Sequence, residues 1–206
     1  MITTHKTTSL QNSLLSARLH DPFSYLGVHR EKGRTLVRVF RPHDVNVWIR
    51  TTIGYEPMSR IHANGIFEWR GEFPPEMPYR LRIEAKGDTQ SVYETYDAYA
   101  FPLQISDHDV YLFNEGKLRQ AYRMLGAQRV RNSGVDGVRF SVWAPNAGRV
   151  SVVGDFNRWD GRIHPMAVHH ASGVWELFIP DLPPNALYKY EIRNRDSGEI
   201  VLKTDP

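Results

Sequence analysis

The sequence of 206 residues contains no cysteine. This absence excludes disulfide bonds and thiolate metal sites, and it fits a reducing cytoplasm. The chain also lacks the run of about 18 apolar residues that a membrane span needs, and residues 1–9 lack the apolar core of a secretory signal. We therefore expect a soluble, cytoplasmic protein that is neither exported nor held in a membrane.

Concentrated charge of one sign is also missing. The net charge is only +3, although the sequence pI is near 9.2. The basic residues are dispersed, and no helix-turn-helix, zinc-finger or RNP pattern accompanies them. Several of them alternate along strand-like segments or fall in a loop-like stretch: Arg30, Lys32, Arg34, Arg38, Arg41, Arg129 and Arg131. Nucleic acid is not an expected partner.

Catalytic and metal-binding motifs are absent as well, including H-E-x-x-H, G-x-S-x-G and a glycine-rich phosphate loop. His169 and His170 are adjacent, so on an extended chain they point to opposite sides and make a poor metal site. A retaining glycosidase needs two carboxylates about 5–5.5 Å apart. The nearest candidates are Asp155 and Asp160, which share one turn, and Glu176, which we expect to face outward from a strand. We interpret all three as turn and surface residues, and we expect no catalytic residue, cofactor or metal.

Short predicted strands are the most frequent elements in the sequence. Ten segments alternate apolar and polar residues or form short apolar runs, with Gly and Pro between them. They are 36–40, 45–49, 65–69, 79–83, 91–93, 138–142, 150–153, 174–179, 188–192 and 200–202. Such spacing predicts antiparallel β-sandwiches.

Two segments have helical periodicity. Residues 9–19 place leucines on one face behind Thr8 or Ser9 as a cap, and Asp21-Pro22 is expected to stop the helix. Residues 106–128 repeat this pattern behind Ser106 or Asp107 and close on Gly126. Residues 23–29 are expected to form a loop.

The two halves of the chain resemble each other, and the offset between matching residues grows as loop insertions require. Phe40 matches Trp143 at an offset of 103, Phe67 matches Trp175 at 108, and Tyr79 matches Tyr188 at 109; the earliest matches are Leu19, Phe23, Leu26 and Gly27 with Leu118, Tyr122, Leu125 and Gly126 at 99. We predict an all-β fold of two tandem immunoglobulin-like antiparallel sandwiches, each preceded by a short helix. The predicted domains are 1–105 and 106–206.

Residues 154–161, Gly-Asp-Phe-Asn-Arg-Trp-Asp-Gly, form a tight loop of turn-forming residues after a predicted strand. An exposed indole beside Asn and Asp suits a sugar, because the ring covers apolar C–H groups while polar neighbours bind hydroxyls. Alternatively, Trp159 folds back onto its own sandwich. The first half has Thr51–Pro57 at this place and no tryptophan, which favours a surface role.

Several segments carry a family resemblance. Residues 138–147, 149–161, 173–180 and 187–191 resemble the glucan-binding module, carbohydrate-binding module family 48, of bacterial 1,4-α-glucan branching enzymes. Residues 21–29 and 112–118 resemble the additional leading module and linker of the branching enzymes with long N-termini.

The resemblance implies that a catalytic (β/α)8 barrel of glycoside hydrolase family 13 follows Asp205-Pro206, so Pro206 is expected to mark a module boundary and the chain to be a fragment that is inactive alone. The parent would transfer α-1,4-glucan segments to 6-hydroxyls in glycogen biosynthesis through a covalent intermediate. This region would bind and orient α-glucan or glycogen chains, adjoin the parent's barrel, and influence the length of the transferred segment.

By the same resemblance, Trp159 stacks on a glucose ring, Lys189 donates to hydroxyls, and Asn157 holds the loop or touches sugar. Related modules have a second tryptophan, which residues 197–201 lack, so binding is expected to be weak. Two alternatives remain: both sandwiches only support the barrel, or the chain begins a debranching enzyme.

Overall fold

A computed structural model describes residues 2–87, 91–169 and 172–205. Contacts divide the chain into two compact units. Residues 25–101 make up one, called here the first module. Residues 1–24 and 102–206 make up the other, called the second module. No helix in the described part of the chain has both the length and the apolar character needed to cross a bilayer.

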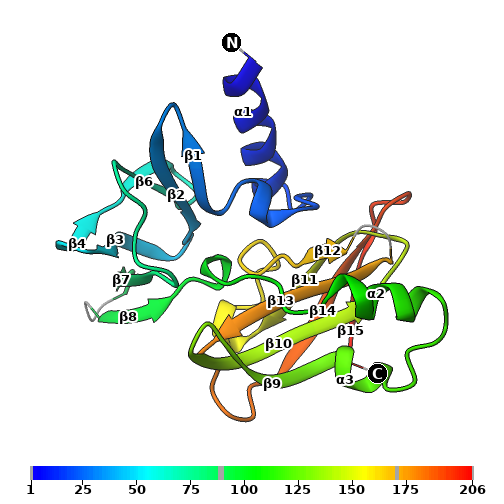
Figure 1. The fold of residues 1–206 in the computed structure, drawn as a ribbon. Helices are drawn as coiled ribbons and strands as arrows, with labels where there is room; N and C mark the ends of the chain where they lie inside the picture. Colours follow the sequence, from blue (N-terminus) through cyan, green and yellow to red (C-terminus); the bar gives the residue numbers. More distant parts are fainter. Residues whose placement is uncertain (1, 88–90, 170–171, 206) are drawn as a thin grey trace. The chain divides into compact units, whose positions relative to one another are not determined.

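The first module contains two four-stranded antiparallel sheets (Figure 1). In the first sheet the order is β1 (Gly27–Glu31), β2 (Arg34–Phe40), β6 (Ile66–Gly71) and β5 (Ser59–His62). In the second it is β4 (Gly54–Pro57), β3 (Asp44–Thr51), β7 (Arg80–Ala85) and β8 (Val92–Tyr96). Their core contains Val37, Val39, Ile49, Leu81 and Ile83, which are all essentially inaccessible to solvent.

The second module has the same kind of architecture. One sheet has the order β12 (Ala167–His169), β13 (Val174–Pro180), β10 (Val135–Trp143) and β9 (Gly126–Asn132). The other has the order β11 (Ala147–Gly154), β14 (Tyr188–Asn194) and β15 (Ile200–Lys203). Phe140 and Tyr188 bridge the two sheets, with their ring centroids 4.8 Å apart.

The strand orders bear out the internal repeat. The order β1-β2-β6-β5 in the first module corresponds to β9-β10-β13-β12 in the second, and β3-β7-β8 corresponds to β11-β14-β15. The first module adds only β4, at the place where the second has residues 154–161. Both modules also end on a Tyr–Asp hydrogen bond, Tyr79 with Asp97 and Tyr188 with Asp205. The all-β prediction is therefore confirmed.

Several local predictions were wrong. The first helix, α1, spans Ile2–Leu15 instead of 9–19, because Ala17 adopts a left-handed φ of 55° and ends it. Leu19 lies beyond the helix, yet it is buried. Residues 27–29, expected to lie in a loop, belong to the edge strand β1, and Arg129 and Arg131, expected in a loop-like stretch, lie on the edge strand β9.

The helical pattern at 106–128 divides into α2 (Asp107–Asn114) and α3 (Ala121–Met124). Ser106 caps α2 by accepting a hydrogen bond from the Asp109 N–H at 3.1 Å. Gly116, with a φ of 66°, lies in the break between the helices. Ile105, Val110 and Met124 pack on Val174 of β13, so this linker covers the sheet that contains β13.

The N-terminal segment contacts the second module after α1 ends. Nδ1 of His20 lies 2.9 Å from the Gly148 carbonyl oxygen, and the His20 ring meets the edge of Trp175 at a centroid distance of 5.1 Å. The compact units thus group residues 1–24 with the second module, whereas the predicted domains group them with the first. Independent folding of domains 1–105 and 106–206 stays a prediction.

Candidate functional site

Residues 154–161 leave the end of β11 and fold into a tight loop. A short 3-10 turn, η3 (Asp155–Asn157), comes first, and Arg158 and Trp159 then both adopt left-handed φ values, 55° and 60°. Non-glycine residues adopt this conformation only where the surroundings fix it. The loop therefore needs local contacts that hold its backbone.

Asn157 supplies those contacts. Its side chain is buried, with Oδ1 accepting from the Gly154 N–H at 2.9 Å and Nδ2 donating to the Val152 carbonyl at 2.8 Å. Nδ2 also lies 3.0 Å from Nδ1 of His164. Both ends of the amide are thus used inside the loop, so Asn157 acts on its shape.

Trp159 is 39% exposed at the turn that Asn157 stabilises. Its indole N–H donates to Oδ1 of Asp155 at 2.8 Å, and its backbone N–H donates to the Gly154 carbonyl at 2.9 Å. The side chain is tied to its own loop through its polar edge. An accessible aromatic surface is therefore held in one orientation.

Lys189 lies next to this loop in the strand register. It pairs with Val153, the penultimate residue of β11, while Tyr188 pairs with Gly154. Tyr188 and Tyr190 face the core, so strand alternation turns half-buried Lys189 to the other face of the sheet. The three predicted site residues thus come from the loop and from the strand paired beside it.

A buried arginine anchors the far end of the loop. Nη1 of Arg149 donates to Ser151 Oγ and to the Gly161 carbonyl, both at 2.6 Å, and Nη2 pairs with Glu191. Gly161 has no room for a side chain, since a Cβ there would lie 2.1 Å from Glu191 Oε1. Next to it, Asp160 binds Arg162 in a two-pronged ion pair, with Nε–Oδ1 at 2.9 Å and Nη2–Oδ2 at 2.6 Å, which raises the pKa of Arg162.

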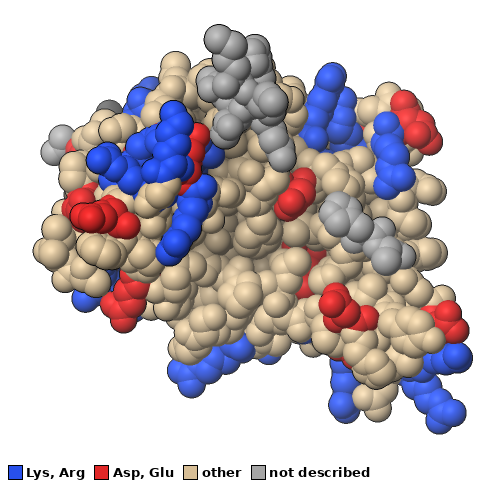
Figure 2. Space-filling view, turned by 45° about the horizontal axis from the view of Figure 1, so that its top comes forward, with Lys and Arg blue, Asp and Glu red and all other residues tan. Residues whose placement is uncertain are grey.

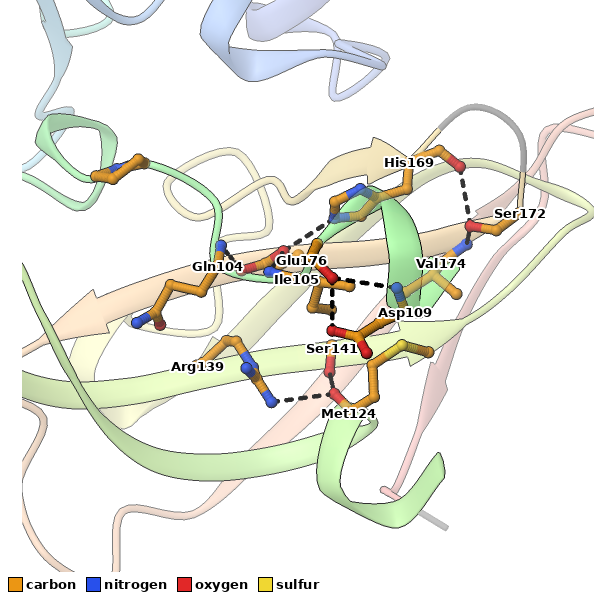
Figure 3. Close-up of polar contacts among 12 residues, drawn as sticks. Gln104, Ile105, Asp109, Met124, Arg139, Ser141, His169, Ser172, Val174 and Glu176 are labelled. Atoms are coloured by element: carbon orange, nitrogen blue, oxygen red, sulfur yellow. Dashed lines mark hydrogen bonds and ion pairs between the residues drawn. The ribbon is translucent and has the colours of Figure 1, made fainter. Parts of the chain in front are cut away.

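Glu176 contradicts its predicted surface position, because its side chain is fully buried. Its oxygens accept from the backbone N–H groups of Gln104, at 2.6 Å, and Ile105, at 3.1 Å. Nε2 of His169 lies 2.9 Å from Oε2. Figure 3 shows this contact beside the bonds to the linker. The linker covers the outward face of β13, so the carboxylate binds the start of that linker and is enclosed by it.

Comparison with known proteins identifies the chain. Residues 7–99 match the family described as alpha-1,4-glucan branching enzyme GlgB, N-terminal domain, and residues 124–206 match Carbohydrate-binding module 48 (Isoamylase N-terminal domain). The 1,4-alpha-glucan branching enzyme GlgB of Nitrosospira multiformis is 64% identical over 197 residues, which is 95% of this chain. That of Methylobacillus flagellatus is 52% identical over the full 206 residues. The chain belongs to the GlgB branching-enzyme family.

The chain covers 26% and 28% of those two relatives, so it corresponds to the N-terminal region of the family. The alternative of a debranching enzyme finds no support in these sequence relatives. Among solved structures, PulA from Klebsiella oxytoca aligns over 88% of this chain and 19% of its own, with a TM-score of 0.35 and 19% identity. That likeness is too remote to bear on function.

The GlgB-family loop has no second aromatic neighbour on the β14–β15 turn. Residues 197–201 contain Gly198, with a φ of 72°, and partly exposed Ile200. The loop at residues 154–161 therefore carries Trp159 without a second tryptophan on the β14–β15 turn. Related modules are expected to have a second tryptophan there, and this chain differs from them at that point.

Metal-binding groups are not assembled in the part of the chain that the structure describes, where no cluster of three His, Asp or Glu side chains is found. His169 is engaged with Glu176, and His170 lies outside the described residues. Basic side chains lie beside acidic ones, and residues other than Lys, Arg, Asp and Glu cover most of the face shown in Figure 2. The absence of nucleic-acid and membrane partners stays a prediction.

Arg149, which anchors the far end of the loop, is a residue of the candidate site that sequence reasoning missed. Its alternation with Val150 and Val152 is that of a solvated strand residue, so the pattern gives no sign that the chain returns to cover it. The only available signal was Gly161, whose place after the loop is compatible with a close approach.

Proposed function

We propose that this chain is a non-catalytic α-glucan-binding region of a 1,4-α-glucan branching enzyme. The observation that carries the proposal is the part-exposed indole of Trp159, held in a fixed orientation within the segment that matches a carbohydrate-binding module. Trp159 stacks on a glucose ring, Lys189 donates to hydroxyls, and Asn157 maintains the loop.

The geometry supports this role because little has to be ordered on binding. The indole N–H is held by Asp155, and the backbone at the start of the loop is held by Asn157. A preformed aromatic surface loses less conformational entropy when it meets a ligand. The loop therefore offers a preformed binding surface for a sugar ring.

The magnitude of the interaction is modest. Covering roughly 100 Å² of indole contributes about 2.5 kcal/mol before the cost of association is subtracted. A site with one tryptophan then binds no tighter than about millimolar. Such a contact suits a region that orients long chains, on which many weak contacts act together.

The activity of the whole protein is part of this proposal. The relatives are named as branching enzymes, and this chain covers about a quarter of their length. We infer that the parent forms α-1,6 branches in cytoplasmic glycogen. The present region then positions the glucan for a catalytic barrel elsewhere in the protein and affects the length of the segment transferred.

Affinity electrophoresis in gels containing glycogen tests the glucan contact. The wild-type chain should be retarded, and Trp159→Ala should lose most of the retardation attributable to the second module. Trp143→Ala removes another exposed tryptophan of the same module and is the matched control. Wild-type mobility unaffected by glycogen, or equal retardation of wild type and Trp159→Ala, would count against the proposal.

A purely structural role is the second candidate, and the missing aromatic at residues 197–201 favours it. On this reading both modules only support the catalytic barrel. A purely structural role predicts that glycogen does not retard the wild-type protein in these gels.

A further inference from the structure

The sheet β4-β3-β7-β8 of the first module (Figure 1) consists of paired antiparallel strands. One of its faces is buried, and the other is rich in aromatic and polar groups. Val47, Ile49, Leu81 and Ile83 fill the buried side. The alternate positions lie on the opposite side, called here the outer face. It comprises Asn46, Trp48, Arg50, Tyr55, Arg80, Arg82, Glu84, Val92, Glu94 and Tyr96.

The internal repeat relates this face to the candidate site of the second module. The offset of 109 that aligns Tyr79 with Tyr188 also aligns Arg80 with Lys189. The β3–β4 hairpin, with Tyr55, takes the place of the loop that carries Trp159. An aromatic ring and a basic side chain therefore occur in the corresponding segments of both sandwiches.

The two faces differ in what covers them. In the second module the chain passes over the sheet after the loop, and it buries Arg149 and Ser151 beneath Gly161. In the first module Asn46 and Arg50 are exposed, and Trp48 is half-buried. This side of the sheet is therefore exposed in the first module. The corresponding side of the β11-β14-β15 sheet is covered by residues of the second module's own chain.

Contacts within the outer face hold the side chains in place. The Arg82 guanidinium lies over the Tyr55 ring, 4.0 Å from its centroid, and pairs with Glu94 at 2.9 Å. The Arg80 guanidinium lies 4.7 Å from the centroid of Tyr96 and donates to its hydroxyl at 2.8 Å. Such stacks order the flat groups of the sheet.

Trp48 lies in the middle of this array, opposite Arg82 on β7 and Pro57 on β4. The other four tryptophans donate their indole N–H to a protein oxygen: Trp69 to Glu56, Trp143 to Ser172, Trp159 to Asp155 and Trp175 to Ala144. Among the described residues Trp48 has no such acceptor. Its N–H can therefore donate to a ligand, and its half-buried ring is accessible only in part.

The charge balance indicates which ligand fits. The outer face has three arginines against two glutamates, and Arg82–Glu94 and Asn46–Glu84 are already paired across strands. A phosphate-binding surface would carry a large excess of cations, whereas three arginines and two glutamates leave this face a net charge of only +1, and an apolar protein interface would carry few charges at its centre. Aromatic rings among paired planar polar groups suit a neutral, hydroxyl-rich chain.

We propose that the outer face of the first module is a second α-glucan-binding site, centred on Trp48 with Tyr55 and Arg82 beside it. The choice of α-glucan as the ligand rests on the function proposed above. The site itself rests on the composition of the outer face and on its correspondence with the Trp159 loop. One chain then contacts glucan through both modules.

The test uses the full 206-residue chain in glycogen gels, with Trp48→Ala, Trp159→Ala and the double variant. Trp159→Ala should keep residual retardation, and adding Trp48→Ala should weaken that residual association about tenfold. Phe73→Ala removes an aromatic of the first module that is 73% exposed and lies off the outer face, and it should change nothing. Circular dichroism checks that each variant folds, and Tyr55→Ala replaces Trp48→Ala if that variant does not.

The outcomes separate the two proposals. Retardation of the double variant equal to that of Trp159→Ala overturns the second site and leaves the Trp159 site standing. Unretarded wild-type protein overturns both. Isothermal titration with a linear α-1,4 malto-oligosaccharide and a β-1,4 cello-oligosaccharide should give heat with the first alone, and equal heats would overturn the assignment of the ligand.

Discussion

At the scale of single residues, Asn157 determines the shape of the loop that carries Trp159. It pairs the N–H of Gly154 and the carbonyl of Val152, two backbone groups on the buried side of the turn. An unpaired buried backbone group costs more than the average hydrogen bond contributes. Asn157 thus holds the loop in shape, whereas Trp159 is the side chain expected to contact sugar.

Replacing Asn157 by Ala should lower the free energy of unfolding by about 2–4 kcal/mol, because both backbone groups lose their partner. The same variant should weaken retardation in glycogen gels while leaving the indole in the chain. Urea unfolding measures the first effect. Asn64→Ala, at an exposed turn, is the matched control and should stay within about 0.5 kcal/mol of wild type. Equal stability of Asn157→Ala and wild type would contradict this account.

At the scale of elements, Glu176 fixes where the linker begins. Three donors converge on its carboxylate, two of them backbone N–H groups at the start of the segment that leads to α2 (Figure 3). A carboxylate accepts at several lone pairs, whereas an amide presents one oxygen and two donors. The linker is therefore held through an acceptor that glutamine reproduces only in part.

Glu176→Gln should destabilise the chain by about 2–3 kcal/mol, since an N–H group of the new amide must face a backbone donor. Limited proteolysis should then cut residues 106–125 faster than in wild type. Glu199→Gln changes an exposed carboxylate and provides the control. A linker cleaved at the same rate in both variants would show that Glu176 does not hold it.

Edge strands explain most of what the sequence did not predict. All ten predicted strands occur, but β1, β4, β5, β9 and β12 were missed, and each lies at the edge of its sheet. Edge strands are polar on more than one side and form by pairing with a neighbour, so their own alternation is weak. Glu176 was misplaced for a related reason, since alternation shows which face it is on but not that a linker covers that face.

At the scale of the whole molecule, buried tyrosines link stability to alkaline pH. Burial raises the pKa of Tyr79 well above its ordinary value of 10.0, and the neighbouring Asp97 raises it further. Burial, and then the neighbouring Asp205, also raise the pKa values of Tyr188 and Tyr190. Between the ordinary and the raised pKa, the folded chain keeps protons that the unfolded chain has released.

The free energy of unfolding should therefore fall as the pH rises above 10, by about 1.4 kcal/mol per pH unit for each such tyrosine. Urea unfolding between pH 8 and pH 11 measures the slope, and tyrosinate absorbance follows the titration. Tyr111→Phe, at a position that is 55% exposed, should leave the curve unchanged. A flat profile would show that the tyrosines ionise equally in both states.

The assignment of residues 1–24 to the second module has a consequence for synthesis on the ribosome. His20 meets Gly148 and Trp175, which are made long after it, whereas residues 25–101 contain all the strands of the first module. At about 5–20 residues per second, Trp175 follows His20 by roughly 8–30 seconds. All strands of the first module are available to pair during that interval, while the N-terminal segment reaches these partners only after the second sandwich has emerged.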